Sequence, residues 1–460
     1  MKRARSIHPK KGSASVSSSS FSMIHPHAAG IDIGSREHWV AVPEERDEHP
    51  VRRFGCFTAD LYALADWLKR CGVETVAMES TGIYWIPLYQ ILEDRGFEVK
   101  LVNARHVKNV PGRKSDVQDC RWLQRLHSYG LLSGSFRPEA QVCVLRSYLR
   151  QRDNLVRYAS AHIQHMQKAL GEMNLQLHKV LSDITGVTGM RIIRAILAGE
   201  RNPAALAALR NYRVKSTEDE IAKALEGDYR AEHLFALQQA VELYDTYQQK
   251  IADCDGRIEA LLGSFEPRLK GQPCVPATPR KRRKNEPYFD LRGHLHRVTG
   301  VDFTQIKGLD TSTVQTLLSE VGLDPTRFPS EKHFCSWMGL CPDHRITGGK
   351  VKKRSTRKVS NRAADAFRLA AQTLANSASA LGGYYRRMRA RLGAPKAITA
   401  TAHKLARLFY RLWKTGDAYQ DPGADYYERM YKERILSNMK RKAKELGFTL
   451  ELKPLERAVS

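Results

Sequence analysis

Short runs of apolar residues near the N-terminus alternate with stretches in which apolar residues recur every three or four positions. Continuous apolar runs bounded by turn residues predict buried strands, whereas the 3–4 spacing predicts amphipathic helices. We predict strands over residues 28–35, 38–42, 53–57, 73–79 and 97–102, and helices over residues 61–70 and 83–94. An antiparallel start followed by β-α-β units is the order that an α/β RNase H-like sheet requires.

The middle of the chain keeps the 3–4 spacing over two much longer segments. Residues 140–174 and 232–262 each contain such an apolar stripe, and Arg152 interrupts the first one. Heptad spacing sustained over this length favours a coiled coil, but two ordinary amphipathic helices packed on a core give the same pattern. The pattern also leaves open whether the two segments pair within one chain or between chains.

These patterns divide the chain into six parts. We predict a disordered basic tail over residues 1–25, an α/β domain over 26–139, a helical or coiled-coil region over 140–267, a basic linker over 268–290, a mainly α C-terminal domain over 291–420 and a charged tail over 421–460. Within the C-terminal domain, the glycine-containing residues 341–350 predict a loop.

Composition adds a strong positive charge to this picture. The 460 residues include 75 Lys and Arg against 49 Asp and Glu, a formal net charge of +26, which favours nucleic acid as a partner. No apolar run approaches the roughly 20 residues that a membrane-spanning helix needs, and the N-terminus lacks the apolar segment of a secretory signal. The eight cysteines form no CxxC pair, which is typical of reduced thiols in a cytoplasmic protein.

The basic residues gather in three clusters that we predict to contact phosphates. The alternative for each is a solvated loop or a disordered linker. The first cluster follows the last predicted strand, the second lies in the linker and the third follows the glycine-containing loop. The members are Arg105, Lys108, Arg113 and Lys114; Arg280, Lys281, Arg282 and Arg283; and Lys350, Lys352, Lys353, Arg354, Arg357 and Lys358.

Four acidic residues accompany the predicted strands and the helix that follows them. Asp32 lies within an apolar strand, where a carboxylate is costly unless a cation compensates its charge, and Glu79 ends a second strand. Asp116 and Asp119 are three residues apart, so they share one face of a helix. Such a set could bind hard cations such as Mg²⁺, with Mn²⁺ as an alternative. Two such ions stabilise the attacking and leaving oxygens in phosphodiester chemistry. Individually, each acid also fits a turn or a helix N-terminus.

A second candidate metal site lies in the C-terminal domain. His333, Cys335, Cys341 and His344 are close in sequence and could bind zinc, although their spacing matches no standard zinc finger. The neighbouring Phe334 favours a packed core instead.

The acidic residues occur in recognisable motifs. Residues 30–34 read GIDIG, residues 78–82 read MESTG and residues 114–119 read KSDVQD. In this order the motifs resemble the DEDD transposases of bacterial insertion sequences, the IS-one-ten family. The resemblance covers most of the chain and implies a RuvC-like N-terminal domain, a C-terminal transposase domain, and a catalytic, metal-binding tetrad formed by Asp32, Glu79, Asp116 and Asp119.

The same resemblance implies a nucleophile in the C-terminal domain. The family has a serine in a loop of the form x-Ser-Gly-x after a Gly-Leu-x-Pro segment. Here the segment reads GLCP over residues 339–342 and the loop reads ITGG over residues 346–349, so Thr347 occupies the serine position. A threonine hydroxyl can act as a nucleophile, with His344 as a nearby base. Ser355, Ser360 and an inactive copy are the alternatives.

What the resemblance implies for function is DNA strand cleavage and exchange through a hydroxyl-linked protein–DNA intermediate. It also implies a guide (bridge) RNA from the element itself, a dimer or tetramer, and a bacterial cytoplasm with nucleoid association. One rival is a RuvC-like nuclease or junction resolvase that uses water as the nucleophile. The other is a decayed relative that binds nucleic acid without catalysis.

Overall fold

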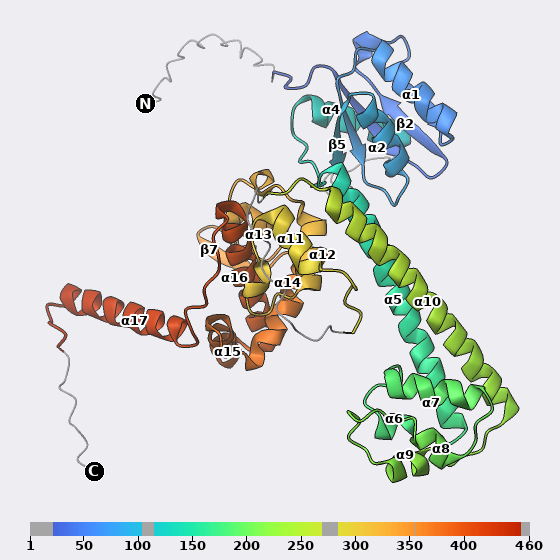
Figure 1. Cartoon of the computed structure of the whole chain (residues 1–460). Coiled ribbons are helices and arrows are strands. Elements are labelled where there is room, and N and C mark those ends of the chain that lie inside the picture. Colours follow the sequence, from blue (N-terminus) through green and yellow to red (C-terminus); the bar gives the residue numbers. More distant parts are fainter. Residues whose placement is uncertain (1–21, 104–114, 269–283, 354, 452–460) are drawn as a thin grey trace, which may run out of the picture. The chain divides into compact units, whose positions relative to one another are not determined.

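The computed structural model describes residues 22–103, 115–268, 284–353 and 355–451 (Figure 1). The chain forms two compact units, Met1–Arg137 and Pro138–Ser460. The finer division into six parts stays a prediction. Across the described residues, no helix combines the length and the apolar character that crossing a membrane requires.

The first unit is built on a five-stranded mixed sheet in the order β3-β2-β1-β4-β5. Its strands are β1 (Ala28–Ile33), β2 (Glu37–Ala41), β3 (Val51–Gly55), β4 (Thr75–Glu79) and β5 (Glu98–Val102). The first three strands are antiparallel, whereas β4 runs parallel to both β1 and β5. A short 3₁₀ helix, Glu44–Arg46, lies between β2 and β3.

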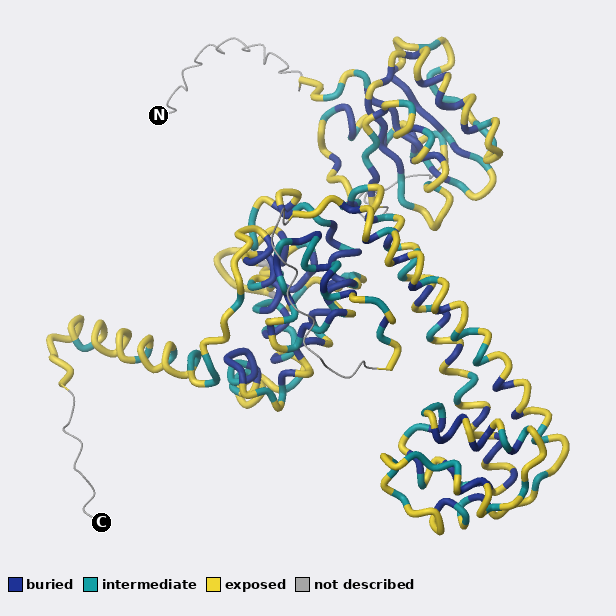
Figure 2. The backbone as a smooth tube through the Cα atoms, in the orientation of Figure 1, coloured by how far each residue is buried: buried dark blue, intermediate teal, exposed yellow. Residues whose placement is uncertain are grey.

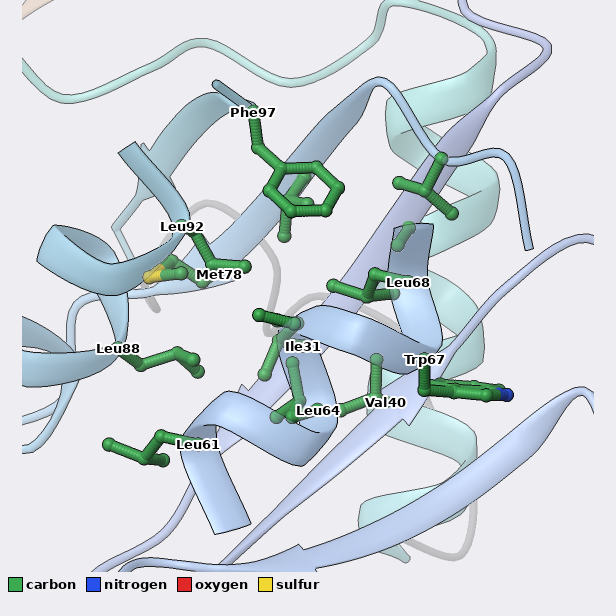
Figure 3. Packing of buried hydrophobic residues seen from close by; sticks show 14 of the residues in the cluster. Ile31, Val40, Leu61, Leu64, Trp67, Leu68, Met78, Leu88, Leu92 and Phe97 are labelled. Atoms are coloured by element: carbon green, nitrogen blue, oxygen red, sulfur yellow. The ribbon is translucent and has the colours of Figure 1, made fainter. Parts of the chain in front are cut away.

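Helices cover both faces of this sheet. On one face, α1 (Thr58–Arg70) and α2 (Trp85–Asp94) bury an apolar core that includes Ile31, Leu64 and Leu88 (Figure 3). On the other face, α4 (Asp116–Ser128) packs Leu123 against Ala77. The predicted α/β RNase H-like, RuvC-like fold of the N-terminal part is confirmed, because the mixed sheet and its helices occur in the expected order.

The second unit begins with a long helical hairpin of α5 (Ala140–Glu172) and α10 (Ala231–Ser264). Arg152 pairs with Asp255, and Glu172 lies near His233, so the two helices run antiparallel. Buried and exposed residues alternate along both helices (Figure 2). The helices therefore pair within one chain. The sequence had left open whether they pair within one chain or between chains. Arg152 is itself buried and bonded to Asp255 at 2.5 Å, which explains the polar interruption in the apolar stripe.

Four short helices close the far end of this hairpin. They are α6 (Leu177–Val180), α7 (Val187–Leu197), α8 (Pro203–Ala207) and α9 (Glu218–Ala224). Their apolar residues form one core with the facing ends of α5 and α10, which includes Met166, Ile193 and Leu237.

The rest of the second unit is mainly helical, as predicted. It contains α11 (Leu291–Thr299), α12 (Thr311–Val321), α13 (Glu331–Trp337), α14 (Arg362–Thr373), α15 (Ala380–Leu392), α16 (Ala394–Thr415) and α17 (Tyr426–Glu445), with 3₁₀ helices at Phe303–Gln305, Pro325–Arg327 and Leu374–Asn376. The core is aromatic: Phe409 of α16 stacks on Phe303 at 4.2 Å and meets Phe367 edge-on.

The predicted loop over residues 341–350 is wrong in part. Arg345–Thr347 forms β6 and Lys350–Lys353 forms β7, which pair as an antiparallel hairpin. Gly348 and Gly349 have φ angles of 53° and 75°, so both adopt the left-handed conformation that a two-residue type I′ turn requires. Two glycines between short strands are a hairpin signal, and this signal overrides the loop prediction.

Candidate active site

Asp32 and Glu79 lie at the carboxyl ends of neighbouring parallel strands. Ile31 of β1 pairs with Met78 of β4, and Asp32 and Glu79 are the next residue on each strand. Because side chains alternate along a strand, both carboxylates point to the face opposite Ile31 and Met78. Those two residues belong to the core under α1 and α2, so the carboxylates belong to the face that α4 covers.

The first turn of α4 supplies the other two acids. Ser115 begins the helix and its hydroxyl accepts a hydrogen bond from the backbone N–H of Gln118 at 3.3 Å. Asp116 and Asp119 follow in the first turn, where carboxylates also interact favourably with the helix dipole. This local geometry agrees with the sequence prediction that the two acids share a helical face.

Gly30 brings α4 close to β1. A Cβ atom at Gly30 would lie 2.2 Å from the backbone nitrogen of Gln124 and 2.5 Å from the carbonyl oxygen of Cys120. No side chain fits there, so the helix packs directly on the strand two residues before Asp32. The side-chain amide of Gln124 also donates to the carbonyl of Ala28 at 3.4 Å. The glycine therefore sets the distance between α4 and the strand that carries Asp32.

The other three acids act electrostatically on Asp32. The pKa of Asp32 is raised from 3.8 to about 6, first by burial and then by the negative charges of Glu79, Asp116 and Asp119. Asp32, Glu79 and Asp119 are partly buried and Asp116 is exposed. The fold thus gathers the predicted tetrad around Asp32 and makes the ionised form of that carboxyl costly.

These residues fit a hard divalent cation in their chemistry. All the donors are carboxylate oxygens, which Mg²⁺ and Mn²⁺ prefer, and a bound cation would relieve the repulsion that raises the pKa of Asp32. In the parts of the chain that the structure describes, however, no three His, Cys, Asp or Glu side chains form a ready-made metal-binding group.

Thr347 lies at the end of β6 and pairs with Lys350 of β7 across the two-glycine turn. Its side chain is exposed, as are His344, Ser355 and Ser360. The hairpin is extended by an isolated bridge between Pro342 and Thr356. The predicted nucleophile is therefore exposed at the end of a short strand, next to a two-residue turn.

The predicted phosphate-binding residues are only partly described. Lys350, Lys352, Arg357 and Lys358 are exposed, and Arg357 also donates to the backbone carbonyl of Ser336. Lys353 lies in β7. The others lie outside the described residues: Arg105, Lys108, Arg113, Lys114, Arg280, Lys281, Arg282, Arg283 and Arg354.

The alternative zinc site receives no support from the packing. Cys335 is fully buried in α13, and burial raises the pKa of its thiol to about 12. Its Sγ lies 3.9 Å from the carbonyl oxygen of His403, and His344 is exposed. Among the described residues no three His, Cys, Asp or Glu side chains form a group that could hold a metal ion, and Cys335 is buried beside Phe334, so this cluster is better explained as core packing.

An RNase H-like sheet with a tetrad of carboxylates at one edge, followed by a helical second unit, is the architecture of a DNA-acting enzyme of the DEDD transposase class. Comparison with protein families agrees with this class. The DEDD transposase model for IS110, described as "Transposase", matches residues 29–175, and the model described as "Transposase IS116/IS110/IS902 family" matches residues 302–386. The chain belongs to the IS110 family of DEDD transposases. A comparison with curated proteins finds no match.

Proposed function

We propose that this transposase cleaves and exchanges DNA strands by metal-dependent phosphoryl transfer and that a guide RNA selects the DNA. The observation that carries the proposal is the convergence of carboxylates from β1, β4 and α4: the pairing of β1 with β4 and the close contact of α4 at Gly30 bring them to one face of the sheet, and their charges contribute to the raised pKa of Asp32. Carboxylates held this close serve little structural purpose, because their mutual repulsion opposes folding. They are the donor set that phosphodiester chemistry uses.

Asp32, Glu79, Asp116 and Asp119 would hold the metal, with Mg²⁺ as the first candidate and Mn²⁺ as the alternative. When bound, such ions supply charge stabilisation to the attacking and leaving oxygens of the phosphate. The chain would contribute the position of the carboxylates: Ile31 pairs with Met78 one residue before Asp32 and Glu79, and the close contact of Gly30 with Cys120 and Gln124 holds α4 against β1.

Thr347 is the proposed nucleophile. In the cleavage step its Oγ1 forms a bond to the scissile phosphorus, and the bond from phosphorus to the 3′ oxygen breaks. The hydroxyl proton passes to the imidazole of His344, and the leaving 3′ oxygen takes up a proton from water. The products are a protein–DNA ester and a free 3′-OH, which can attack a second ester and so complete the exchange.

The cationic residues of the β6–β7 hairpin are proposed to hold the DNA backbone. Lys350 and Lys352 are exposed on β7, next to the turn that presents Thr347. The guide RNA, nucleoid association and a dimer or tetramer of the chain complete the proposal. These three elements rest on membership of the family together with the net charge of +26.

The test is cleavage by purified protein with Mg²⁺, candidate element RNA and DNA that carries the element ends. Asp32→Asn should abolish cleaved and protein-linked strands but leave DNA binding nearly intact, because one charge among many barely alters the electrostatic contribution. Asp94→Asn is the matched control, since Asp94 is an exposed acid of α2 in the same unit. Cleavage by the Asp32→Asn protein at the wild-type rate contradicts the proposed tetrad.

A RuvC-like nuclease with water as the nucleophile is the second candidate. It is favoured by one observation: within the described part of the chain, the hydroxyl of Thr347 is exposed and makes no hydrogen bond to a base. The two candidates differ in one product. A nuclease releases free DNA ends, whereas attack by Thr347 leaves a strand that migrates with the protein after denaturation.

A further inference from the structure

A pocket of about 460 Å³ lies among α15, α16 and the start of α17, within the second unit. Its volume is in the range of small-ligand sites. The ten lining residues comprise four tyrosines, four Lys or Arg residues and two methionines, and none of the ten is acidic. The aromatic rings and positive charges that contact one another in this pocket belong to Tyr384, Arg387, Lys404, Tyr427, Tyr431 and Arg434. Neither the transposase chemistry nor the predicted basic clusters involve them.

Lys404, one of the lining residues, contacts two aromatic rings. Its Nζ is 4.7 Å from the ring centre of Tyr384 and 4.2 Å from that of Tyr427. The side chain is half-buried, and among the described residues no carboxylate forms an ion pair with it. Burial and the like charges of Arg407 and Arg434 lower the pKa of Lys404. The Lys404 ammonium group thus has aromatic partners but no anionic one among the described residues, and a bound anion would supply it.

The neighbouring arginines add further positive charge. Arg387 stacks on the ring of Tyr431 at 3.2 Å and lies 3.6 Å from Glu428, the one carboxylate with which the structure pairs it. Arg434 is exposed and lies 6.0 Å from the same ring. The pocket therefore keeps a net positive charge even when Glu428 is included.

The start of α17 is held firmly against α15. A Cβ atom at Gly383 would lie 2.4 Å from the carbonyl oxygen of Ala424, so the chain just before α17 packs directly on α15. Asp421 accepts a hydrogen bond from the backbone N–H of Ala380 at 3.0 Å. Beyond this anchored start, α17 has no buried residue, and Figure 2 shows it mostly exposed. The pocket is thus formed on one side by a helix whose remaining surface is free of core packing.

We propose that this pocket binds an unpaired nucleotide, with the base stacked on the tyrosine rings and the phosphate held by Lys404 and Arg434. Aromatic faces and cations in one groove are what single-stranded nucleic acid requires, because every base has a stacking face and every link carries a phosphate. A duplex hides its base faces and would gain only the phosphate contacts. The proposal extends the function proposed above and rests on it insofar as nucleic acid is the partner.

The same residues could merely fix α17 in place, and the charge pattern argues against that. The start of α17 is already anchored by the contact of Gly383 with Ala424 and by the hydrogen bond from Ala380 to Asp421, and the rings of Tyr427 and Tyr384 add a contact with their centres 5.3 Å apart. Arg434 forms no ion pair among the described residues and is exposed, so it contributes little to packing. A phosphate explains the placement of Arg434 and Lys404 on the same pocket, whereas helix packing does not.

The test is fluorescence anisotropy of the full-length protein in EDTA, which separates binding from cleavage. The probes are a labelled RNA of about 12 nucleotides, the DNA strand of the same sequence and the corresponding duplex. Tyr427→Leu should weaken binding of the unpaired strands about tenfold, as expected for loss of one stacked base, and Tyr427→Phe should retain it. Arg434→Gln should weaken binding and make the plot of log affinity against log salt shallower by about 0.7.

Arg429→Gln is the matched control, because Arg429 is an exposed arginine of the same helix that does not line the pocket. Preference for the RNA or for the DNA strand identifies which unpaired strand the pocket serves. Equal effects of Arg434→Gln and Arg429→Gln, or equal losses for duplex and unpaired strands, overturn the proposal. Because no cleavage is measured, either result leaves the Asp32→Asn test of the proposed function unaffected.

Discussion

Asp32 is partly buried, lies near three other acids and is proposed to bind the metal. The sequence indicated that a carboxylate inside an apolar strand needs compensation, and the fold surrounds it with three more acids. Without a cation this arrangement destabilises the first unit. A destabilising arrangement of this kind is retained where function requires it, as is typical of catalytic sites.

The pKa of Asp32 predicts how stability changes with pH. The folded-state pKa of about 6 exceeds the ordinary value of 3.8, so the folded protein retains a proton that the unfolded chain releases. Raising the pH from about 4 to 7 therefore costs stability, on the order of 3 kcal/mol. Asp32→Asn should stabilise the first unit at pH 7 in EDTA but not at pH 4.

Hydrogen exchange of the β1 amides measures this difference, because it reports on the first unit alone. Addition of Mg²⁺ at pH 7 should slow exchange in the wild-type protein and leave the Asp32→Asn variant nearly unchanged. If Asp32→Asn is more stable than the wild-type protein by the same amount at pH 4 and at pH 7, then Asp32 does not titrate in this range.

Thr347 gives a second prediction at the scale of single residues. Thr347→Ala should abolish the covalent protein–DNA species, because the attacking oxygen is removed. Thr347→Ser should retain or raise it, since serine offers the same oxygen without the methyl group that hinders approach. Denaturing electrophoresis of labelled DNA detects the adduct. Persistence of the adduct in Thr347→Ala places the nucleophile elsewhere, and Ser355 is the next residue to test.

At the scale of elements, the contact between α4 and β1 positions the tetrad. Gly30→Ala would place a methyl group 2.2 Å from the backbone nitrogen of Gln124, so α4 must move away. Overpacking of this kind typically costs about 1–3 kcal/mol. We expect lower stability of the first unit and a lower pKa for Asp32, because Asp116 and Asp119 move with the helix.

The control is Gly171→Ala in α5, where a Cβ atom would meet nothing within 4 Å. That substitution should stabilise its helix by about 0.5–1 kcal/mol. NMR titration of the Asp32 carboxyl measures the first effect and chemical denaturation measures both. An unchanged Asp32 pKa in Gly30→Ala would mean that the helix position does not control the tetrad.

The two long helices are joined by a buried ion pair. Arg152 lies on an otherwise apolar stripe, and its charge is compensated by Asp255 on the opposite helix. Removing one partner of a buried pair leaves an uncompensated charge. The pair thus favours the antiparallel register in which the two residues meet, a constraint that apolar heptads alone do not provide.

At the scale of the whole molecule, the net positive charge predicts that binding of nucleic acid depends on salt. The net charge of +26 and the exposed lysines of β7 imply many phosphate contacts. If six or more phosphates are bound, affinity should fall by about 10³ or more between about 50 and 200 mM salt. Filter binding or anisotropy with duplex DNA at several salt concentrations measures the slope. A flat dependence would refute a phosphate-dominated interface.

Lys350, Lys352 and Lys358 test whether the hairpin contributes to that slope. Replacing all three with Gln should make the log–log slope shallower by about 2–3, since each phosphate contact contributes roughly 0.9. Replacing Lys432, Lys440 and Lys444 of α17 in the same way gives a variant of equal net charge in which the hairpin is intact. Equal slopes for the two triple variants would indicate diffuse attraction instead of a defined interface.

The sequence by itself determined the local elements, because hydrophobic periodicity and turn residues act over a few positions. It therefore predicted the strands of the sheet, the two long helices and the spacing of Asp116 and Asp119. Only the tertiary structure decided which distant residues meet. The packing at Gly30, the partner of Arg152 and the tyrosine pocket on α17 depend on contacts between segments far apart in the chain. Periodicity carries no information about such partners, because it reports which face of an element is buried and not what covers it.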